Sequence, residues 1–441
     1  MEKSIIYLGV KMKKAALHNL GCKVNAYETE AMQQMLEAAG YEIVPFNEPA
    51  DVYVVNTCSV TNMADRKSRQ MLHKAKKNNP DSIVVATGCY VQTSEQEALE
   101  DLSIDIVIGN NRKHELVSLI EEFAKDNVLD INHEKQEFEE LFVSQTAEHT
   151  RAFIKVQDGC NQFCSYCIIP YARGRVRSRK LENVIDEVMR LASNGYKEVV
   201  LTGIHLSSYG VDFEDKTDLL ALIQAVNRVD GIERIRLGSL EPKIVTEEFA
   251  SALSQMPKVC PHFHLSLQSG CDATLKRMNR RYTAEEYETG CRLLRKYFKH
   301  PAITTDVIVG FPGESDEEFE ITKQFLKKIH FYEMHIFKYS KRKGTRAAVM
   351  QDQVAEQIKT GRSAELISLG NEMSDEFRMY YTGKIKDVLF EEKVEINGKS
   401  YYTGYTKEYV KVAKESEETL ENQIIEGKIT GRLTDDIYIM R

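Results

Sequence analysis

The chain has 441 residues, of which 42% are hydrophobic, enough for roughly two to four domains with ordinary cores. Its net charge of −8 and pI near 5.9 exclude binding of nucleic acid through overall positive charge, so any RNA contact needs local basic patches. No apolar run approaches membrane length, and no cleavage-type site follows the apolar run 5–10. Nine cysteines in such a chain indicate a reducing cytoplasmic compartment. Residues 1–11 either extend a strand or result from a translation start upstream of a second possible start at Met12.

Residues 13–125 alternate apolar strand patterns with helical patterns. We expect strands at 15–20, 52–55, 83–86 and 104–108, and helices at 28–39, 61–78 and 113–123. Short apolar strands separated by helices are typical of a parallel α/β sheet that is buried on both faces. The first domain is therefore predicted to be such a sheet.

Three cysteines, Cys22, Cys58 and Cys89, follow strands of this region at equivalent places. Because the carboxyl ends of parallel strands meet at one edge of an open sheet, where ligands bind, we expect the three thiols to converge. A single small residue at a strand end needs no explanation beyond packing. Three thiols at matched positions favour a metal-cluster site.

Charged residues dominate 126–145, which we interpret as a linker or a surface helix. The region 146–376 again alternates strands with helices. Strands are expected at 152–156, 198–201, 234–237, 262–267, 303–309 and 333–337, and helices at 181–194, 284–298 and 316–329. Six such units predict a parallel (β/α)6 partial barrel, whose chemistry lies at the carboxyl ends of its strands.

The first of these strands is followed by Cys160, Cys164 and Cys167, spaced C-x3-C-x2-C. A loop with this spacing can wrap one metal centre, and soft thiolates suit iron–sulfur clusters and zinc. A structural zinc site normally has four ligands, and no other Cys or His follows closely, so zinc is the weaker interpretation. Three thiolates on a four-iron cluster leave one iron open to a small molecule.

Residues at other strand ends of the barrel are candidate cofactor contacts, although each could instead cap a helix or satisfy a turn. These candidates are Gly203, Glu241, Gln268 and Asp306. The basic stretch 171–180, which contains Arg173, could hold an RNA phosphate or a cofactor carboxylate with its guanidinium forks. An exposed charged turn is the competing interpretation, and 338–346 is the next most basic stretch.

A helical stretch at 350–378 leads to a tail, 377–441, of short strands separated by glycine turns. The strands are expected at 387–390, 401–405, 409–412, 423–425 and 436–439, which predicts a small antiparallel β-barrel. Its Tyr401, Tyr402, Tyr405 and Tyr409, with Lys407 and Lys411, could stack on RNA bases. The many Glu residues of the tail weaken that interpretation.

The cysteine motif at 160–167 and the longer run 153–179 resemble the radical S-adenosylmethionine (SAM) methylthiotransferases, and the resemblance covers nearly the whole chain. It implies an α/β chain of an N-terminal sheet domain, a partial barrel and a C-terminal TRAM domain that binds RNA. It also implies SAM as cofactor, two [4Fe-4S] clusters and an electron donor such as flavodoxin or ferredoxin. One cluster would be held by Cys22, Cys58 and Cys89, and the other by Cys160, Cys164 and Cys167.

The resemblance further implies that a C–H bond becomes C–SCH3, with SAM used as methyl donor and as radical source. Segments 21–25, 157–161 and 201–210 are most similar to the class that acts on C2 of N6-threonylcarbamoyladenosine (t6A) at position 37 of tRNA, giving ms2t6A. His205, Ser207 and Ser208 would suit that polar group. Methylthiolation of isopentenyladenosine or of a ribosomal-protein aspartate stays open. A non-catalytic RNA-binding protein and a redox relay are the remaining alternatives. Cys260, Cys271 and Cys291 fit no pattern and are expected to be buried thiols.

Overall fold

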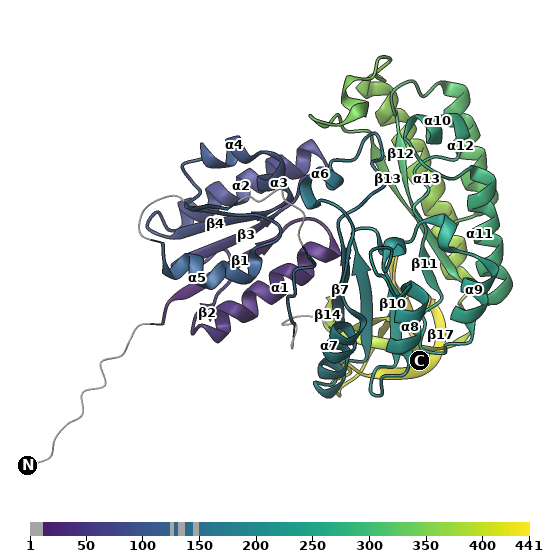
Figure 1. Cartoon of the computed structure of the whole chain (residues 1–441). Coiled ribbons are helices and arrows are strands. Elements are labelled where there is room, and N and C mark those ends of the chain that lie inside the picture. Colours follow the sequence, from purple (N-terminus) through teal and green to yellow (C-terminus); the bar gives the residue numbers. More distant parts are fainter. Residues whose placement is uncertain (1–11, 124–127, 131–136, 144–149) are drawn as a thin grey trace, which may run out of the picture. The chain divides into compact units, whose positions relative to one another are not determined.

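The computed structural model describes residues 12–123, 128–130, 137–143 and 150–441 (Figure 1). These residues form two compact units, and each is described by itself. The first comprises residues up to 143 together with 171–173, and the second comprises the others from 144 onward. The finer domain limits expected from the sequence remain predictions. No helix within the described ranges is both long and apolar enough to cross a membrane.

The first unit is a parallel sheet, as predicted, with the order β2-β1-β3-β4-β5-β6 among its described strands. The strands are β1 (Lys14–Asn19), β2 (Glu42–Ile43), β3 (Val52–Thr57), β4 (Ile83–Gly88), β5 (Ile106–Ile108) and β6 (Val128–Asp130). The helices are α1 (Lys23–Ala38), α2 (Asn62–Asn78), α3 (Cys89–Thr93), α4 (Glu95–Leu99) and α5 (Leu116–Glu121), with a 3-10 turn η1 (Lys113–Glu115). The predicted linker, 126–145, lies partly outside the described residues. Its described part contains β6, which was not predicted because the segment is dominated by charged residues.

Helix α1 begins five residues earlier than predicted. Val24, Tyr27 and Ala31 are buried along one face, so the helical repeat already starts directly after Cys22. Cys22 is the N-cap residue of this helix, and Cys89 is the first residue of α3. Two cysteines therefore stand where a strand end passes into a helix.

The second unit contains the predicted partial barrel, built from two sheets ordered β10-β9-β7-β8 and β11-β12-β13. Isolated bridges between Ile235 and Val259 and between Leu240 and Leu265 connect the two. The strands are β7 (Arg151–Asp158), β8 (Arg177–Ser178), β9 (Glu198–Gly203), β10 (Arg234–Leu237), β11 (His262–His264), β12 (Ala302–Val309) and β13 (Glu333–Lys338). All described pairs among them are parallel except β7–β8.

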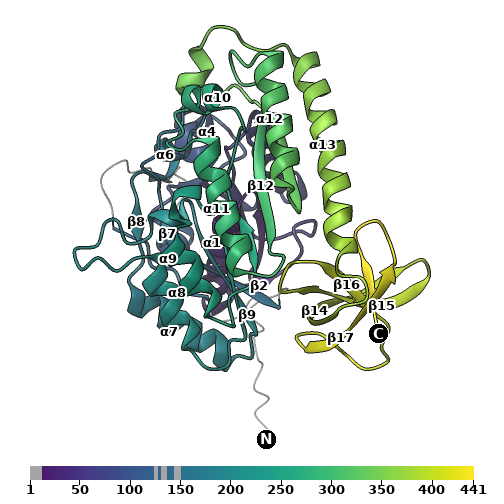
Figure 2. The ribbon, with the colours of Figure 1, turned by 90° about the vertical axis from the view of Figure 1, so that its right-hand side faces the viewer.

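Helices cover one face of these strands. They are α7 (Leu181–Ser193), α8 (Leu219–Asn227), α9 (Glu247–Ser254), α10 (Asp272–Arg277), α11 (Ala284–Tyr297), α12 (Asp316–Ile329) and α13 (Glu356–Met379), with 3-10 turns η2 (Leu206–Ser208), η3 (Pro242–Ile244) and η4 (Arg346–Val349). The short helix α6 (Ile169–Arg173) precedes them, and its residues 171–173 belong to the first unit. Figure 2 shows α12 and α13 beside β12, and α13 packs on β13. Capping boxes start α11 at Thr283 and α12 at Ser315, so their first turns are fixed locally.

The tail is a closed small barrel in the order β14-β15-β16-β18-β17. Its strands are β14 (Ile385–Ile396), β15 (Lys399–Thr406), β16 (Lys411–Lys414), β17 (Ile424–Arg432) and β18 (Tyr438–Met440). The predicted barrel is thus confirmed, except that β16 and β18 pair in parallel. An antiparallel pattern was expected throughout, because a sequence shows the strands and turns but not which strands close the barrel.

The tyrosines of the tail do not form the exposed stacking surface that we expected. Tyr401 and Tyr402 are buried, at 5% and 6% exposure. Tyr409 stacks on His262 of β11 with ring centroids 4.7 Å apart, and on Tyr405 at 4.4 Å. The guanidinium of Arg151 lies over the rings of Tyr405 and Tyr409. The four rings therefore pack inside the small barrel or against the partial barrel, because their apolar area is more stable when removed from water.

A buried carboxylate, that of Glu198, lies where the small barrel packs against the partial barrel. Glu198 pairs with Arg236 at 2.7 Å and lies 3.9 Å from Arg234. Arg236 also donates to the carbonyl oxygen of Lys407 at 3.0 Å, and Arg234 donates to that of Tyr405 at 2.8 Å. Burial by itself raises the pKa of Glu198, but the charge and hydrogen bonds of Arg236, with the other arginines, hold that pKa below its ordinary value. Glu198 is therefore ionised and neutralises the arginines that hold the small barrel.

We expect Glu198→Gln to lower the free energy of unfolding by about 3–5 kcal/mol at pH 7, because it leaves buried guanidinium groups without their counter-charge. The carboxylate contributes fully above the unfolded-state pKa of about 4.3, and its contribution is lost as the pH falls through the lower folded-state pKa. Urea unfolding followed by circular dichroism measures the difference. The control is Glu233→Gln, whose exposed pair with Lys197 should be worth less than about 1 kcal/mol. Equal urea midpoints for Glu198→Gln and the wild type would contradict this role.

Candidate cluster and cofactor sites

The loop of Cys160, Cys164 and Cys167 follows β7 and is held in one shape by backbone contacts. Gly159 has φ +70°, and a Cβ there would lie 1.9 Å from the carbonyl oxygen of Arg175, so only glycine fits. The amide of Cys160 donates to the carbonyl oxygen of Gly174 at 3.1 Å, and that of Cys167 donates to the carbonyl oxygen of Cys164 at 3.0 Å. The loop is therefore preformed.

The three thiols of this loop are close enough to affect one another electrostatically. Burial is the main cause that raises the pKa of Cys160 to about 11 and that of Cys167 to about 12, and the charge of Cys164 contributes to both shifts. Thiolates gathered in this way need a cation to be stable, and a bound metal deprotonates its thiol ligands outright. The soft, converging donor set fits a [4Fe-4S] cluster.

Arg280 is a neighbour of this loop that the sequence did not single out. Its Nη1 lies 3.2 Å from the Sγ of Cys164, and its Nε lies 3.0 Å from the hydroxyl of Tyr282. Its Nη2 lies 3.9 Å from a carboxylate oxygen of Glu241. Arg280 belongs to a turn after α10, where a basic residue gives no signal of what it will contact.

Glu241, predicted as a cofactor contact, lies beside the same loop. It accepts a hydrogen bond from Nε2 of Gln162 at 3.2 Å, and Nε2 of His205 lies 3.2 Å from it. Burial raises the pKa of Glu241, but His205 and Arg280 hold it below the ordinary value. The carboxylate is therefore an ionised acceptor next to the cysteine loop, as a group that binds ribose hydroxyls must be.

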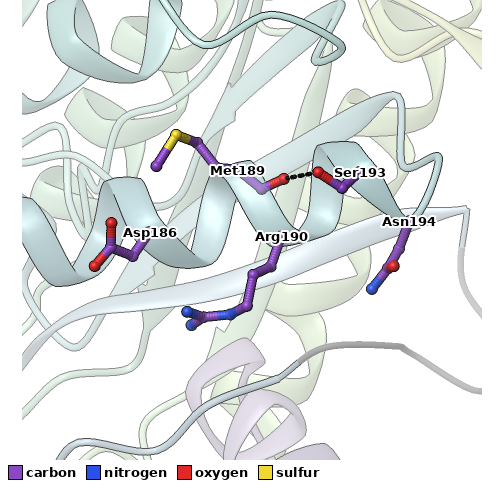
Figure 3. Close-up of a pocket in the computed structure, with 5 residues that line it drawn as sticks. All are labelled: Asp186, Met189, Arg190, Ser193 and Asn194. Carbon is purple, nitrogen blue, oxygen red and sulfur yellow. Dashed lines mark hydrogen bonds between the residues drawn. The ribbon is translucent and has the colours of Figure 1, made fainter.

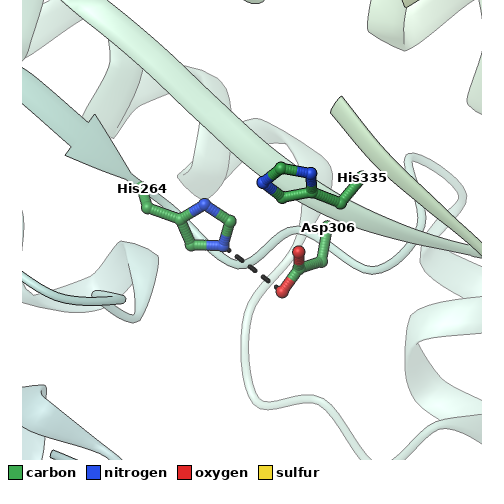
Figure 4. A group of neighbouring side chains, drawn as sticks. All are labelled: His264, Asp306 and His335. Atoms are coloured by element: carbon green, nitrogen blue, oxygen red, sulfur yellow. Dashed lines mark ion pairs between the residues drawn. The ribbon is translucent and has the colours of Figure 1, made fainter. Parts of the chain in front are cut away.

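The other predicted contacts are placed as follows. A Cβ at Gly203 would lie 2.8 Å from the side chain of Gln157, so only glycine lets the end of β9 approach β7 so closely. Gln268 has φ +69°, a strained conformation for a residue with a side chain, and its amide donates to the carbonyl oxygen of Asp306 at 2.8 Å. Asp306 itself lies beside His264 and His335 (Figure 4).

Arg173 makes a different contact from the one expected. Its buried guanidinium donates to Glu28 at 2.9 Å and to Asn25 at 2.7 Å, within the first unit. In the second unit, Arg177 lies 3.3 Å from Asp158, and Arg179 forms a buried pair with Glu187. Three of the four arginines of the basic stretch therefore neutralise buried carboxylates, while Arg175 and Lys180 are exposed.

The strand-end cysteines of the first unit converge as predicted. Gly21 has φ +107°, and a Cβ there would lie 2.8 Å from the Sγ of Cys58, which brings the Cys22 turn against that thiol. Burial is the main cause that raises the pKa of Cys22, and it also raises the pKa of Cys58 to about 11; the charge of Cys89 contributes to both shifts. Three mutually coupled thiols thus gather at the carboxyl edge of the sheet. Their role as cluster ligands stays a prediction.

Two other features among the described residues of the second unit do not gather thiols. Cys260, Cys271 and Cys291 are buried, as expected. A shallow pocket beside α7 is lined by Asp186, Met189, Arg190, Ser193 and Asn194, and Ser193 donates there to the carbonyl oxygen of Met189 (Figure 3). These residues offer neither thiols nor imidazoles.

Comparisons with known proteins agree with this arrangement. Residues 154–326 match the family model described as the radical SAM superfamily, and residues 14–109 match the uncharacterized protein family UPF0004. The chain is 42% identical over 423 residues to the threonylcarbamoyladenosine tRNA methylthiotransferase MtaB of Bacillus subtilis, covering 95% of this chain and 94% of that protein. It is 36% identical to the tRNA-2-methylthio-N(6)-dimethylallyladenosine synthase of Pelotomaculum thermopropionicum, with 95% and 96% covered.

The fold is similar to that of the radical SAM methyltransferase TsrM from Kitasatospora setae, with a TM-score of 0.56 at 18% identity and 77% and 74% of the two chains covered. That likeness concerns the fold alone. The long, high-identity matches carry the assignment: this chain belongs to the radical SAM methylthiotransferase family.

Proposed function

We propose that this protein modifies tRNA by methylthiolating C2 of t6A at position 37, which gives ms2t6A. The observation that carries the proposal is the presence of two separate three-cysteine sites, one at the strand ends of each unit. The relative from Bacillus subtilis, whose name states this substrate, matches over almost the whole chain. Modification of dimethylallyladenosine is the second candidate, favoured by the 36% identical relative named for it.

Each site would hold one [4Fe-4S] cluster through three thiolates, Cys160, Cys164 and Cys167 in one unit and Cys22, Cys58 and Cys89 in the other. When bound, the barrel cluster with SAM supplies hydrogen abstraction and the second cluster supplies sulfur, while SAM also supplies the methyl group. A reductant is needed, and a one-electron donor such as flavodoxin or ferredoxin fits. The protein's own groups bind, orient and shield these components.

Glu241 is the acceptor that we assign to the ribose hydroxyls of SAM, because it is ionised and lies beside the cysteine loop. Gly203 and Gln268 shape the neighbouring strand ends for a close approach of the cofactor. Arg280 acts as a positioning residue through its contact with Cys164. RNA binding by the TRAM-like tail would use residues other than its four packed tyrosines.

Mass spectrometry of tRNA nucleosides tests the substrate. In a strain that lacks the gene, we expect ms2t6A to disappear while t6A accumulates, because the unmodified precursor is made independently. The wild-type gene should restore ms2t6A, and Cys164→Ala should not, since it removes a cluster ligand. Persistence of ms2t6A in the deletion strain would refute the assignment, and loss of the dimethylallyl product instead would favour the second candidate.

Removal of Arg280 should make the barrel cluster harder to reduce. An N–H donor on a ligating sulfur stabilises the more negative, reduced cluster, so Arg280→Met should lower the reduction potential. An anaerobic redox titration followed by electron paramagnetic resonance measures the change, with iron content checked to be unaltered. The matched control is Arg281→Met, since Arg281 is exposed. An unchanged potential in Arg280→Met would show that the contact has no electrostatic effect on the cluster.

A further inference from the structure

A polar group that the proposed roles leave unused lies on three neighbouring strands of the partial barrel (Figure 4). His264 ends β11, Asp306 belongs to β12 and His335 belongs to β13, where it pairs in register with Asp306. One nitrogen or oxygen atom from each lies within 4.8 Å of the others. Nε2 of His264 is 3.3 Å from a carboxylate oxygen of Asp306.

This His–Asp–His group faces away from the surrounding helices. Phe263, Leu265 and Val307 belong to the core that packs on those helices, and Met334 and Ile336 pack against the same core. Because side chains alternate between the two faces of a strand, the residues between them point to the opposite face, which is the interior of the barrel. His335 is exposed, so a ligand can reach the group.

Strand β12 connects the group to the apolar cluster on which a residue of the cysteine loop packs. Ile308 is two residues beyond Asp306 on the same face, and it packs in a cluster that includes Tyr166, between Cys164 and Cys167. Two residues of a strand span about 7 Å. A ligand that reacts at the cysteine loop can therefore extend to the His–Asp–His group.

The group is oriented for binding. Nδ1 of His264 is 3.0 Å from the hydroxyl of Thr304, which fixes the ring with Nε2 toward Asp306. The rings of His264 and His335 are stacked, with centroids 5.8 Å apart. The described residues that form an ion pair with Asp306 include no lysine or arginine. The carboxylate thus retains acceptor capacity, and the two imidazoles offer donors beside it.

We propose that this group binds the N6 substituent of the target adenosine, a ureido-linked hydroxy amino acid; the inference rests on the proposed function. Asp306 accepts from the ureido N–H groups or the hydroxyl, and the imidazoles donate to the carbonyl or carboxylate. C2 and C6 flank N1 in the adenine ring and N6 is attached to C6, so the substituent projects from the ring beside the reacting carbon. A substituent that projects in this way can reach along β12 from the cysteine loop toward the His–Asp–His group.

An apolar dimethylallyl substituent would offer these three side chains no hydrogen-bonding group on the ligand. Sites built to hydrogen-bond a ligand reject analogues that lack the bonding groups, by factors of up to about 10⁴. The group therefore selects a polar substituent over an isoprenoid one. In this proposal Asp306 contacts the substrate and not the cofactor, which differs from the role that the sequence suggested.

The test uses reconstituted protein with SAM but without reductant, so that binding is measured without turnover. Fluorescence anisotropy compares two anticodon stem-loops that differ only in having t6A or adenosine at position 37. We expect the wild type to prefer the t6A stem-loop by at least about tenfold. His335→Phe and Asp306→Asn should lose that preference with unchanged affinity for the adenosine stem-loop. His330→Asn is the matched control, because His330 is exposed and pairs with Glu376 outside the barrel interior.

Equilibrium dialysis of SAM and metal analysis complete the design. A drop in SAM affinity in Asp306→Asn would make Asp306 a cofactor contact and overturn the inference. If the wild type binds one metal ion in addition to the cluster iron, and Asp306→Asn loses that ion, the group is a metal site and the inference is also overturned. Retention of the t6A preference in both His335→Phe and Asp306→Asn would also overturn the inference. If the wild type, once reduced, forms no ms2t6A, the proposed function itself fails.

Discussion

The carboxyl ends of parallel strands meet at one edge, and this constraint determines where both three-cysteine sites stand. In the first unit it brings together thiols that are more than thirty residues apart in sequence. In the second unit it places a preformed cysteine loop at the end of β7, beside the end of β9. If each site holds the proposed four-iron cluster, three thiolates leave that cluster one ligand short, and the open position would suit the site to chemistry rather than to structure.

Buried charge is the second organising interaction. In the basic stretch 171–180, Arg173 neutralises the buried Glu28, and Arg236 of β10 likewise neutralises Glu198. A buried charge is stable only with a partner, so these pairs fix the positions of the segments that carry them.

The sequence predicted the periodic features well. Strand and helix patterns identified the sheet, the partial barrel and the small barrel, because alternation and apolar runs reflect burial directly. The strand-end position of the first three cysteines also predicted their convergence. Partners across the fold were not predictable. Tyr409 was expected to meet RNA but stacks on His262, and neither Arg280 nor His335 stood out. Their contacts come from residues distant in the chain, on which periodicity carries no information.

The most direct test of the two-site arrangement is the iron and acid-labile sulfide content per chain after anaerobic reconstitution. The wild type should hold about eight irons, and alanine replacement of all three cysteines in either site should leave about four. Full iron content after replacing Cys22, Cys58 and Cys89 together would show that these thiols are structural. The protein would then be a single-cluster radical SAM enzyme, and sulfur insertion by a second cluster would have to be abandoned.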